Sequence, residues 1–116
     1  MAHTPNRVES SHRDRGPIVA RVICSECDGD RAIAVVRKSP DGALFLVFER
    51  YWEPGTRPAN QHREWGRRVE VYATRFHAPR TREVTCPEHG PRRVTGEAVD
   101  EAAALGTPSK PRRVTV

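Results

Sequence analysis

Three cysteines and one histidine stand in two short pairs whose donor atoms suit a metal ion. The pairs are Cys24-x2-Cys27 and, much later in the chain, Cys86-x2-His89. Two donors three positions apart on a tight turn can point at one spot, and two such turns together supply a tetrahedron. Zn²⁺ takes four N or S donors in structural sites, and soft thiolates suit zinc better than magnesium or calcium. The pattern therefore predicts one structural Zn²⁺ ion.

Both pairs resemble the knuckles of the zinc-ribbon family. Cys86-Pro87-Glu88-His89-Gly90 is similar to the C-P-x-C-G knuckle, with His in the second ligand position. Cys24-Ser25-Glu26-Cys27-Asp28-Gly29 is similar to the partner knuckle, with its Gly one residue later. The resemblance implies that each pair lies at the tip of a β-hairpin, and it associates the chain with nucleic-acid machinery. The separation between the knuckles is much longer than in familiar ribbons.

Three other interpretations of the cysteines are open. They could be ordinary buried thiols, with His89 a surface histidine. A rubredoxin-like iron site is less well matched, because iron in that setting prefers four thiolates. A redox dithiol wants a helix N-terminus beside its reactive cysteine, whereas Asp28-Gly29-Asp30 after Cys27 indicates a turn.

An enzymatic interpretation has one weak candidate. His62-Arg63-Glu64 followed by Cys86-x2-His89 distantly resembles the H-x-E and P-C-x-x-C motifs of zinc nucleotide deaminases. Thr85 stands where Pro belongs, His89 replaces the last Cys, and Cys24 and Cys27 stay unexplained. A zinc ion with four protein ligands has no open position for substrate or water. We therefore expect no catalytic residues, no small-molecule substrate and no enzyme activity.

Composition limits the size of the core that must position these ligands. The chain has 116 residues, of which 36% are hydrophobic and 30% charged, with 20 Lys plus Arg, 15 Asp plus Glu and a net charge of +5. A small domain with so little apolar material usually needs a staple, and a metal would serve. Three cysteines do not suit a disulfide framework.

The chain shows neither an apolar membrane span nor a signal-peptide h-region, so we expect a cytoplasmic protein without membrane contact.

The elements that must carry the ligands are mainly β-strands. Residues 18–23 form a β-prone run into the first knuckle, and residues 31–37 and 44–48 flank Ser39-Pro40-Asp41-Gly42. In that turn Pro presets φ, Asp can bond its own backbone and Gly accepts positive φ. A β-hairpin is the most strongly indicated element here.

The later part of the chain predicts one more strand and one helix. Val69 to Phe76 alternates, with Val69, Val71 and Ala73 on one face and Tyr72, Thr74 and Phe76 on the other. Residues 80–85 lead into the second knuckle. Thr95 is a suitable N-cap for a short helix over Gly96–Leu105, which Gly106 and Pro108 end.

Two segments carry basic and aromatic side chains outside these elements. Residues 51–68 predict a long loop insertion, in which arginines lie between Tyr51, Trp52 and Trp65. Residues 107–116 predict a basic flexible tail. Arginine beside aromatic rings can neutralise phosphates and stack bases, although a Trp can equally close the core. The candidate nucleic-acid-binding residues are Arg57, Arg63, Arg67, Arg68, Trp52, Lys110, Arg112 and Arg113.

The sequence thus predicts a mainly β, small α+β protein. Residues 1–16 form a disordered tail, residues 17–106 form a zinc-ribbon-like antiparallel domain that ends in a short helix, and residues 107–116 form the basic flexible tail. Two hypotheses for its function remain. In the first, it is a non-enzymatic module that binds DNA or RNA on a zinc-stapled scaffold. In the second, it docks on a protein partner, for example in a regulatory or phage assembly.

Overall fold

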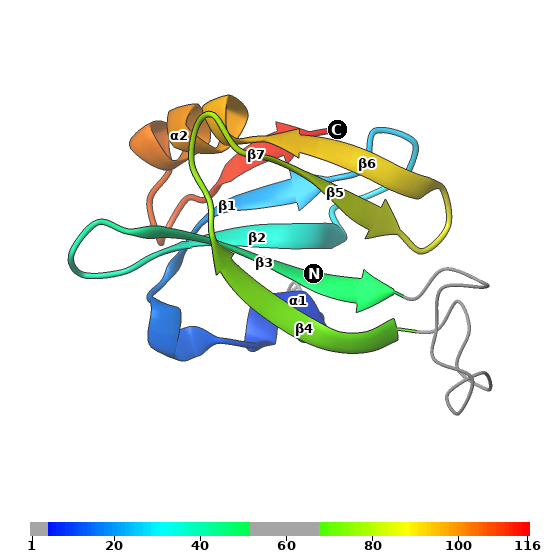
Figure 1. Ribbon diagram of the computed structural model, residues 1–116, viewed down its shortest axis with the longest axis horizontal. Coiled ribbons are helices and arrows are strands. Elements are labelled where there is room, and N and C mark those ends of the chain that lie inside the picture. Colours follow the sequence, from blue (N-terminus) through cyan, green and yellow to red (C-terminus); the bar gives the residue numbers. More distant parts are fainter. Residues whose placement is uncertain (1–4, 52–67) are drawn as a thin grey trace.

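A five-stranded sheet and a separate two-stranded hairpin form the fold (Figure 1). The computed structural model describes residues 5–51 and 68–116, with only the backbone of Arg68 and Val69. The elements in chain order are α1 (Arg7–Ser10), the 3-10 helix η1 (Arg13–Arg15), β1 (Ile18–Ile23), β2 (Ala32–Lys38), β3 (Leu44–Tyr51), β4 (Arg68–Arg75), β5 (Thr81–Cys86), β6 (Gly90–Thr95), α2 (Gly96–Leu105) and β7 (Arg112–Thr115). The expected mainly β, small α+β class is confirmed.

The large sheet has the strand order β4-β3-β2-β1-β7. Its first four strands are antiparallel neighbours, while β7 runs parallel to β1. The predicted hairpin is β2–β3, and its turn has the expected chemistry. The carboxylate of Asp41 accepts a hydrogen bond from the backbone N–H of Ala43 at 3.3 Å, and Gly42 has a φ of +89°.

Both faces of the large sheet are covered, which explains the continuous apolar run in β2. Ala34 and Val36 pack into the larger core cluster beneath α2 and the β5–β6 hairpin. Val35 points to the opposite face and packs with Val8 of α1. A central strand buried on both sides needs apolar residues at successive positions rather than an alternating pattern.

Residues 5–16 are ordered, and the prediction of a disordered tail over residues 1–16 is wrong for them. The guanidinium of buried Arg37 donates to the carbonyls of Glu9, Ser11 and Gly16 at 2.7, 3.1 and 2.6 Å. The side chain of Asn6 accepts from the backbone N–H of Glu9 and donates to the carbonyl of Ala32. Polar contacts of this kind leave no apolar periodicity in the sequence, which is why the segment looked disordered.

The C-terminal segment is also part of the fold. Residues 112–115 form β7, with buried Val114 in the larger core cluster, so the expectation of a flexible tail is wrong there. The pairing continues past the strand, because Val116 exchanges backbone hydrogen bonds with Ile23 and Ser25. A four-residue edge strand next to a buried one gives little sequence signal of its own.

The helix α2 confirms the predicted bounds and cap. The hydroxyl of Thr95 accepts a hydrogen bond from the backbone N–H of Ala98, and Val99 and Ala102 are buried against the sheet. Gly106 ends the helix with φ of −83°, so its role is close approach: a Cβ there would lie 2.0 Å from the carbonyl oxygen of Val19. Leu105, the last residue of the helix, is 58% exposed. In the described part of the chain, no helix has the length and apolar character needed to cross a bilayer.

Candidate metal centre

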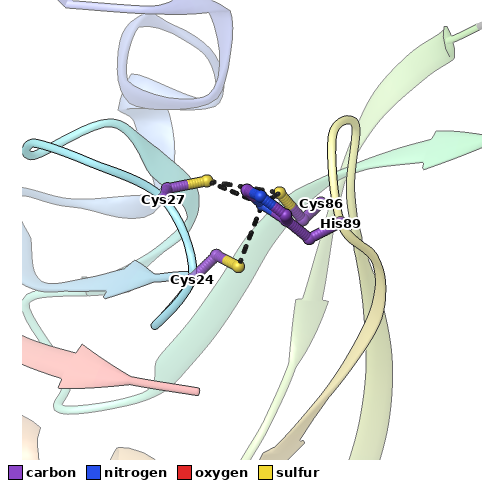
Figure 2. Close-up of side chains that lie close together, drawn as sticks. All are labelled: Cys24, Cys27, Cys86 and His89. Carbon is purple, nitrogen blue, oxygen red and sulfur yellow. Dashed lines mark hydrogen bonds between the residues drawn. The ribbon is translucent and has the colours of Figure 1, made fainter.

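The four predicted ligands come together at the meeting point of two turns. Cys24 and Cys27 lie in the turn after β1, while Cys86 ends β5 and His89 lies in the turn before β6. Figure 2 shows the three sulfurs and the imidazole converging from these two sides. All four ligand atoms lie within 4.8 Å of one another. The predicted pairing of the two half-sites is therefore confirmed as a cluster that could hold a metal ion.

Distances within this Cys3His cluster have the size that a tetrahedral ion requires. The Nδ1 atom of His89 lies 3.7, 3.4 and 3.6 Å from the sulfurs of Cys24, Cys27 and Cys86. The sulfurs of Cys27 and Cys86 are 3.5 Å apart. With metal–sulfur bonds of about 2.3 Å and metal–nitrogen bonds of about 2.0 Å, the tetrahedron's edges are about 3.5 Å for S···N and about 3.8 Å for S···S. The donor set fits such an ion.

Burial divides the cluster into an inner and an outer half. Cys24 and Cys86 are buried in the larger core cluster, Cys27 is half-buried and His89 is exposed. All three cysteines are free thiols. An ion bound here would be anchored in the core by two sulfurs and shielded from solvent mainly by the imidazole. It would join the hairpin to the large sheet.

The thiols affect one another's ionisation. Hydrogen bonding to the thiol of Cys86, with burial and the thiol of Cys24, raises the pKa of Cys27 to about 12. Burial disfavours the thiolate of Cys24, but the backbone N–H of Glu26, the two neighbouring thiols and the charge of Arg92 together lower the pKa of Cys24. Metal ligation needs thiolates, so uptake of an ion must displace protons from this cluster.

An ion pair connects the two turns beside the cluster. The guanidinium of Arg92 on β6 donates to the carboxylate of Glu26, which lies between Cys24 and Cys27. This hydrogen bond and the charge of Arg92 lower the pKa of Glu26. The same guanidinium also acts on the cluster, because its charge helps to lower the pKa of Cys24 and so favours the thiolate that a metal ion needs. Nothing in the sequence predicts this pair, because the spacing of Glu26 and Arg92 does not mark them as neighbours.

Four of the eight candidate nucleic-acid-binding residues lie in the described part of the chain, and three of these line one hollow: Lys110, Arg112 and Arg113. Lys110 and Arg112 are exposed, beside α2 and on β7. Arg113 is exposed too, but it forms an ion pair with Asp30 at 2.9 Å. Of Arg68 only the backbone is described, in β4. The predicted loop begins at Tyr51 in β3, and the remaining candidates lie outside the described residues: Trp52, Arg57, Arg63 and Arg67.

The other interpretations can be compared with this geometry. His62, Arg63 and Glu64 of the deaminase-like motif lie outside the described residues. Cys24 and Cys27, which that motif leaves unexplained, are part of the cluster.

Comparison with known proteins adds no relative: no protein-family model, no curated protein and no solved structure matches this chain. Inference about function therefore depends on the chain's own residues.

Proposed function

We propose that this chain is a small non-enzymatic protein whose Cys3His cluster binds one structural Zn²⁺ ion, and that the scaffold so held binds nucleic acid. The observation that carries the zinc proposal is the set of four donor atoms, which all lie within 4.8 Å of one another; the three S···N distances and the Cys27–Cys86 S···S distance, 3.4–3.7 Å, fit the edges of a tetrahedron. Three thiolates favour zinc among the common hard and borderline cations. Four protein donors leave no ligand position for a substrate, so the ion's role is structural.

The position of the cluster supports a stapling role. The hairpin contributes only a few large side chains to the core, among them Val84 and Val94. An ion bound by Cys86 and His89 on one side and by Cys24 and Cys27 on the other would fix the hairpin's tip to the sheet. The placement of both donor pairs in hairpin turns is also what the zinc-ribbon resemblance implies.

Charge supports the nucleic-acid part of the proposal. The net charge is +5. Basic side chains at Lys110 and Arg112 are exposed, and within the described ranges no carboxylate pairs with them. Contacts of this type bind phosphates without reading sequence, and their affinity falls with salt as counterions are released.

Two measurements test the two parts separately. Mass spectrometry of the protein purified under reducing conditions should find one zinc per chain, and Cys86→Ser should lose most of it. Glu88→Gln, in the same turn, is the matched control and should keep its zinc. Fluorescence anisotropy with labelled single- and double-stranded DNA and RNA should show binding at low salt that weakens steeply as salt rises. A wild-type protein without stoichiometric metal would overturn the zinc proposal, and no binding at low salt would overturn the nucleic-acid proposal.

Docking on a protein is the second candidate, and one specific surface favours it. Leu105 is 58% exposed beside β7, which is an edge strand of the large sheet. A hollow there is lined by Ala98, Ala102, Leu105 and Val114 together with Glu101 and two arginines. If the protein binds no nucleic acid, this surface predicts co-purification of a defined protein partner that nuclease treatment does not remove and that Leu105→Ser does.

A further inference from the structure

We propose that a hollow between β4 and β5 is a phosphate-binding site, which receives a backbone phosphate of the nucleic acid. Its free volume is about 120 Å³, and its lining residues are Thr74, Arg75, Phe76, Arg80, Thr81 and Arg82. A single water needs only about 10–15 Å³ of such free volume, so the hollow has room for a phosphate group. The inference rests on the proposed function and deepens it by naming a point of contact.

The backbone around the hollow is held in place on both sides. The backbone N–H of Arg80 donates to the carbonyl of His77 at 2.9 Å, and its carbonyl accepts from the N–H of Gly96 at 2.7 Å. Phe76, which also lines the hollow, is 2% exposed and belongs to the larger core cluster. The Arg80 side chain therefore extends from a fixed position rather than from a free loop.

Arg82 is positioned by an aromatic ring. It lies on the same side of β5 as the buried residues Val84 and Cys86, so it faces the large sheet. Its guanidinium carbon lies 4.7 Å from the centre of the Phe48 ring. Stacking on a ring uses the flat face of the guanidinium and leaves its N–H groups free to donate at the edge. Such an edge matches the oxygens of a phosphate.

Charge in the hollow has one sign. None of its lining residues is acidic. Within the described ranges, the ion pairs engage Arg21, Arg92 and Arg113 but neither Arg80 nor Arg82. The hydroxyls of Thr74 and Thr81 add neutral donors to the lining. Two unpaired guanidinium groups with hydroxyls beside them are the usual partners of a phosphate, whereas Arg75 lies over Phe45 and adds charge at the rim.

The test uses the full-length zinc-loaded protein, with Arg80→Gln and Arg82→Gln alone and combined. Arg93→Gln is the matched control: it removes the same charge from the same hairpin, and Arg93 does not line the hollow. Zinc content and thermal unfolding establish that each variant folds. Inorganic phosphate is titrated first and followed by backbone and arginine side-chain NMR signals, with chloride at equal ionic strength as reference. Labelled single-stranded DNA is then titrated at several salt concentrations.

We expect phosphate to shift the signals of Thr74 and of residues 80–82, and the double variant to lose these shifts. The double variant should bind DNA about tenfold or more weakly, with the salt slope reduced by roughly 0.7 for each charge that had neutralised a phosphate. Arg93→Gln should change affinity much less. Equal weakening by Arg93→Gln and by the hollow variants would overturn the site and leave nucleic-acid binding standing. Wild-type protein that binds no DNA contradicts the proposed function instead, and the phosphate titration then decides the hollow alone: localised shifts uphold an anion site, and their absence overturns it.

Discussion

The two faces of the large sheet are covered by segments that are fixed in different ways. On one face, the β5–β6 hairpin and α2 contribute apolar side chains, and the hairpin tip meets the sheet through the Cys3His cluster. On the other face, residues 5–16 contribute little beyond Val8 and are held by Arg37 through main-chain carbonyls. Only 36% of the residues are hydrophobic, so apolar contacts in a domain of this size are limited. Each covering segment therefore adds one polar group to its apolar contacts, the Cys3His cluster on one face and Arg37 on the other.

This difference has a chemical consequence. A guanidinium that donates to carbonyls is part of the chain, and its bonds persist wherever the arginine stays charged. A cluster of thiols and an imidazole can join two segments through a metal ion only when the ion is available and the donors have lost their protons. If the cluster binds the proposed ion, the hairpin face is conditional on metal, whereas the contacts of Arg37 on the N-terminal face are not. Four experiments can break or sharpen this contrast.

The largest effect should follow removal of the metal. Treatment with a strong chelator, or Cys86→Ser, should lower the midpoint of the thermal transition by more than any of the variants below, because the free energy of binding a structural metal ion is also folding free energy. Circular dichroism and hydrogen exchange follow the destabilisation, with Glu88→Gln as control. Amide protection should be lost first in β5 and β6. An unchanged transition after complete chelation would show that the hairpin does not need the ion.

Replacing Arg37 should cost less, and on the other face. Arg37→Met keeps the length of the side chain but deprives the carbonyls of Glu9, Ser11 and Gly16 of their donors. We expect a loss of about 2–4 kcal/mol in the free energy of unfolding, measured by urea denaturation, and faster hydrogen exchange in residues 7–15. Lys38→Met is the neighbouring control, because Lys38 is exposed. Zinc content should not change in either variant, and a loss of zinc in Arg37→Met would mean that the two covers are coupled.

The ion pair beside the cluster should have a smaller effect, confined to the metal. Arg92→Gln removes the charge that faces the thiolates and the partner of Glu26. Loss of such supporting contacts typically weakens metal affinity by about 10–100-fold, and we expect the lower end for a pair whose carboxylate is mostly exposed. Competition with a chromophoric chelator measures the affinity, and Arg93→Gln controls for the charge. If the two variants bind the metal with equal affinity, the Arg92–Glu26 ion pair does not support metal binding.

The smallest effect should come from the β2–β3 turn, which belongs to neither cover. Hydrogen bonds from the hydroxyl of Ser39 and the backbone N–H of Ala43 lower the pKa of Asp41 below its ordinary value of 3.8. A lowered folded-state pKa stabilises the fold above the unfolded value, and this stabilisation is lost as the pH falls through the folded value. Asp41→Asn should therefore melt slightly below wild type at neutral pH, and the difference should vanish in acid. A difference that persists in acid would exclude the carboxylate's charge as its cause.

Sequence reasoning found the local features of this fold and missed the nonlocal ones. The turn at Ser39–Gly42 and the cap at Thr95 act through neighbours in the chain, so residue types at fixed offsets predict them. The metal cluster joins distant segments, but cysteines are few and chemically distinct, which makes their pairing readable. Arg37 and Arg92 had no such mark among many arginines. Their partners are main-chain carbonyls and one of fifteen acidic side chains, and only the folded structure selects them.

The parallel pairing of β7 with β1 has a kinetic consequence. This pairing joins Ala20 to Arg112, so almost the whole described chain lies in the loop that it closes. Contacts between residues so far apart in sequence slow folding, because the chain loses the entropy of closing the loop before the new contacts stabilise it. An ion that first links the turn after β1 to the turn after β5 would leave a loop roughly three times shorter, which lowers the closure cost by about 1 kcal/mol. The zinc-loaded chain should then complete its sheet severalfold faster than the metal-free chain, so the ion would set the order of assembly as well as its stability.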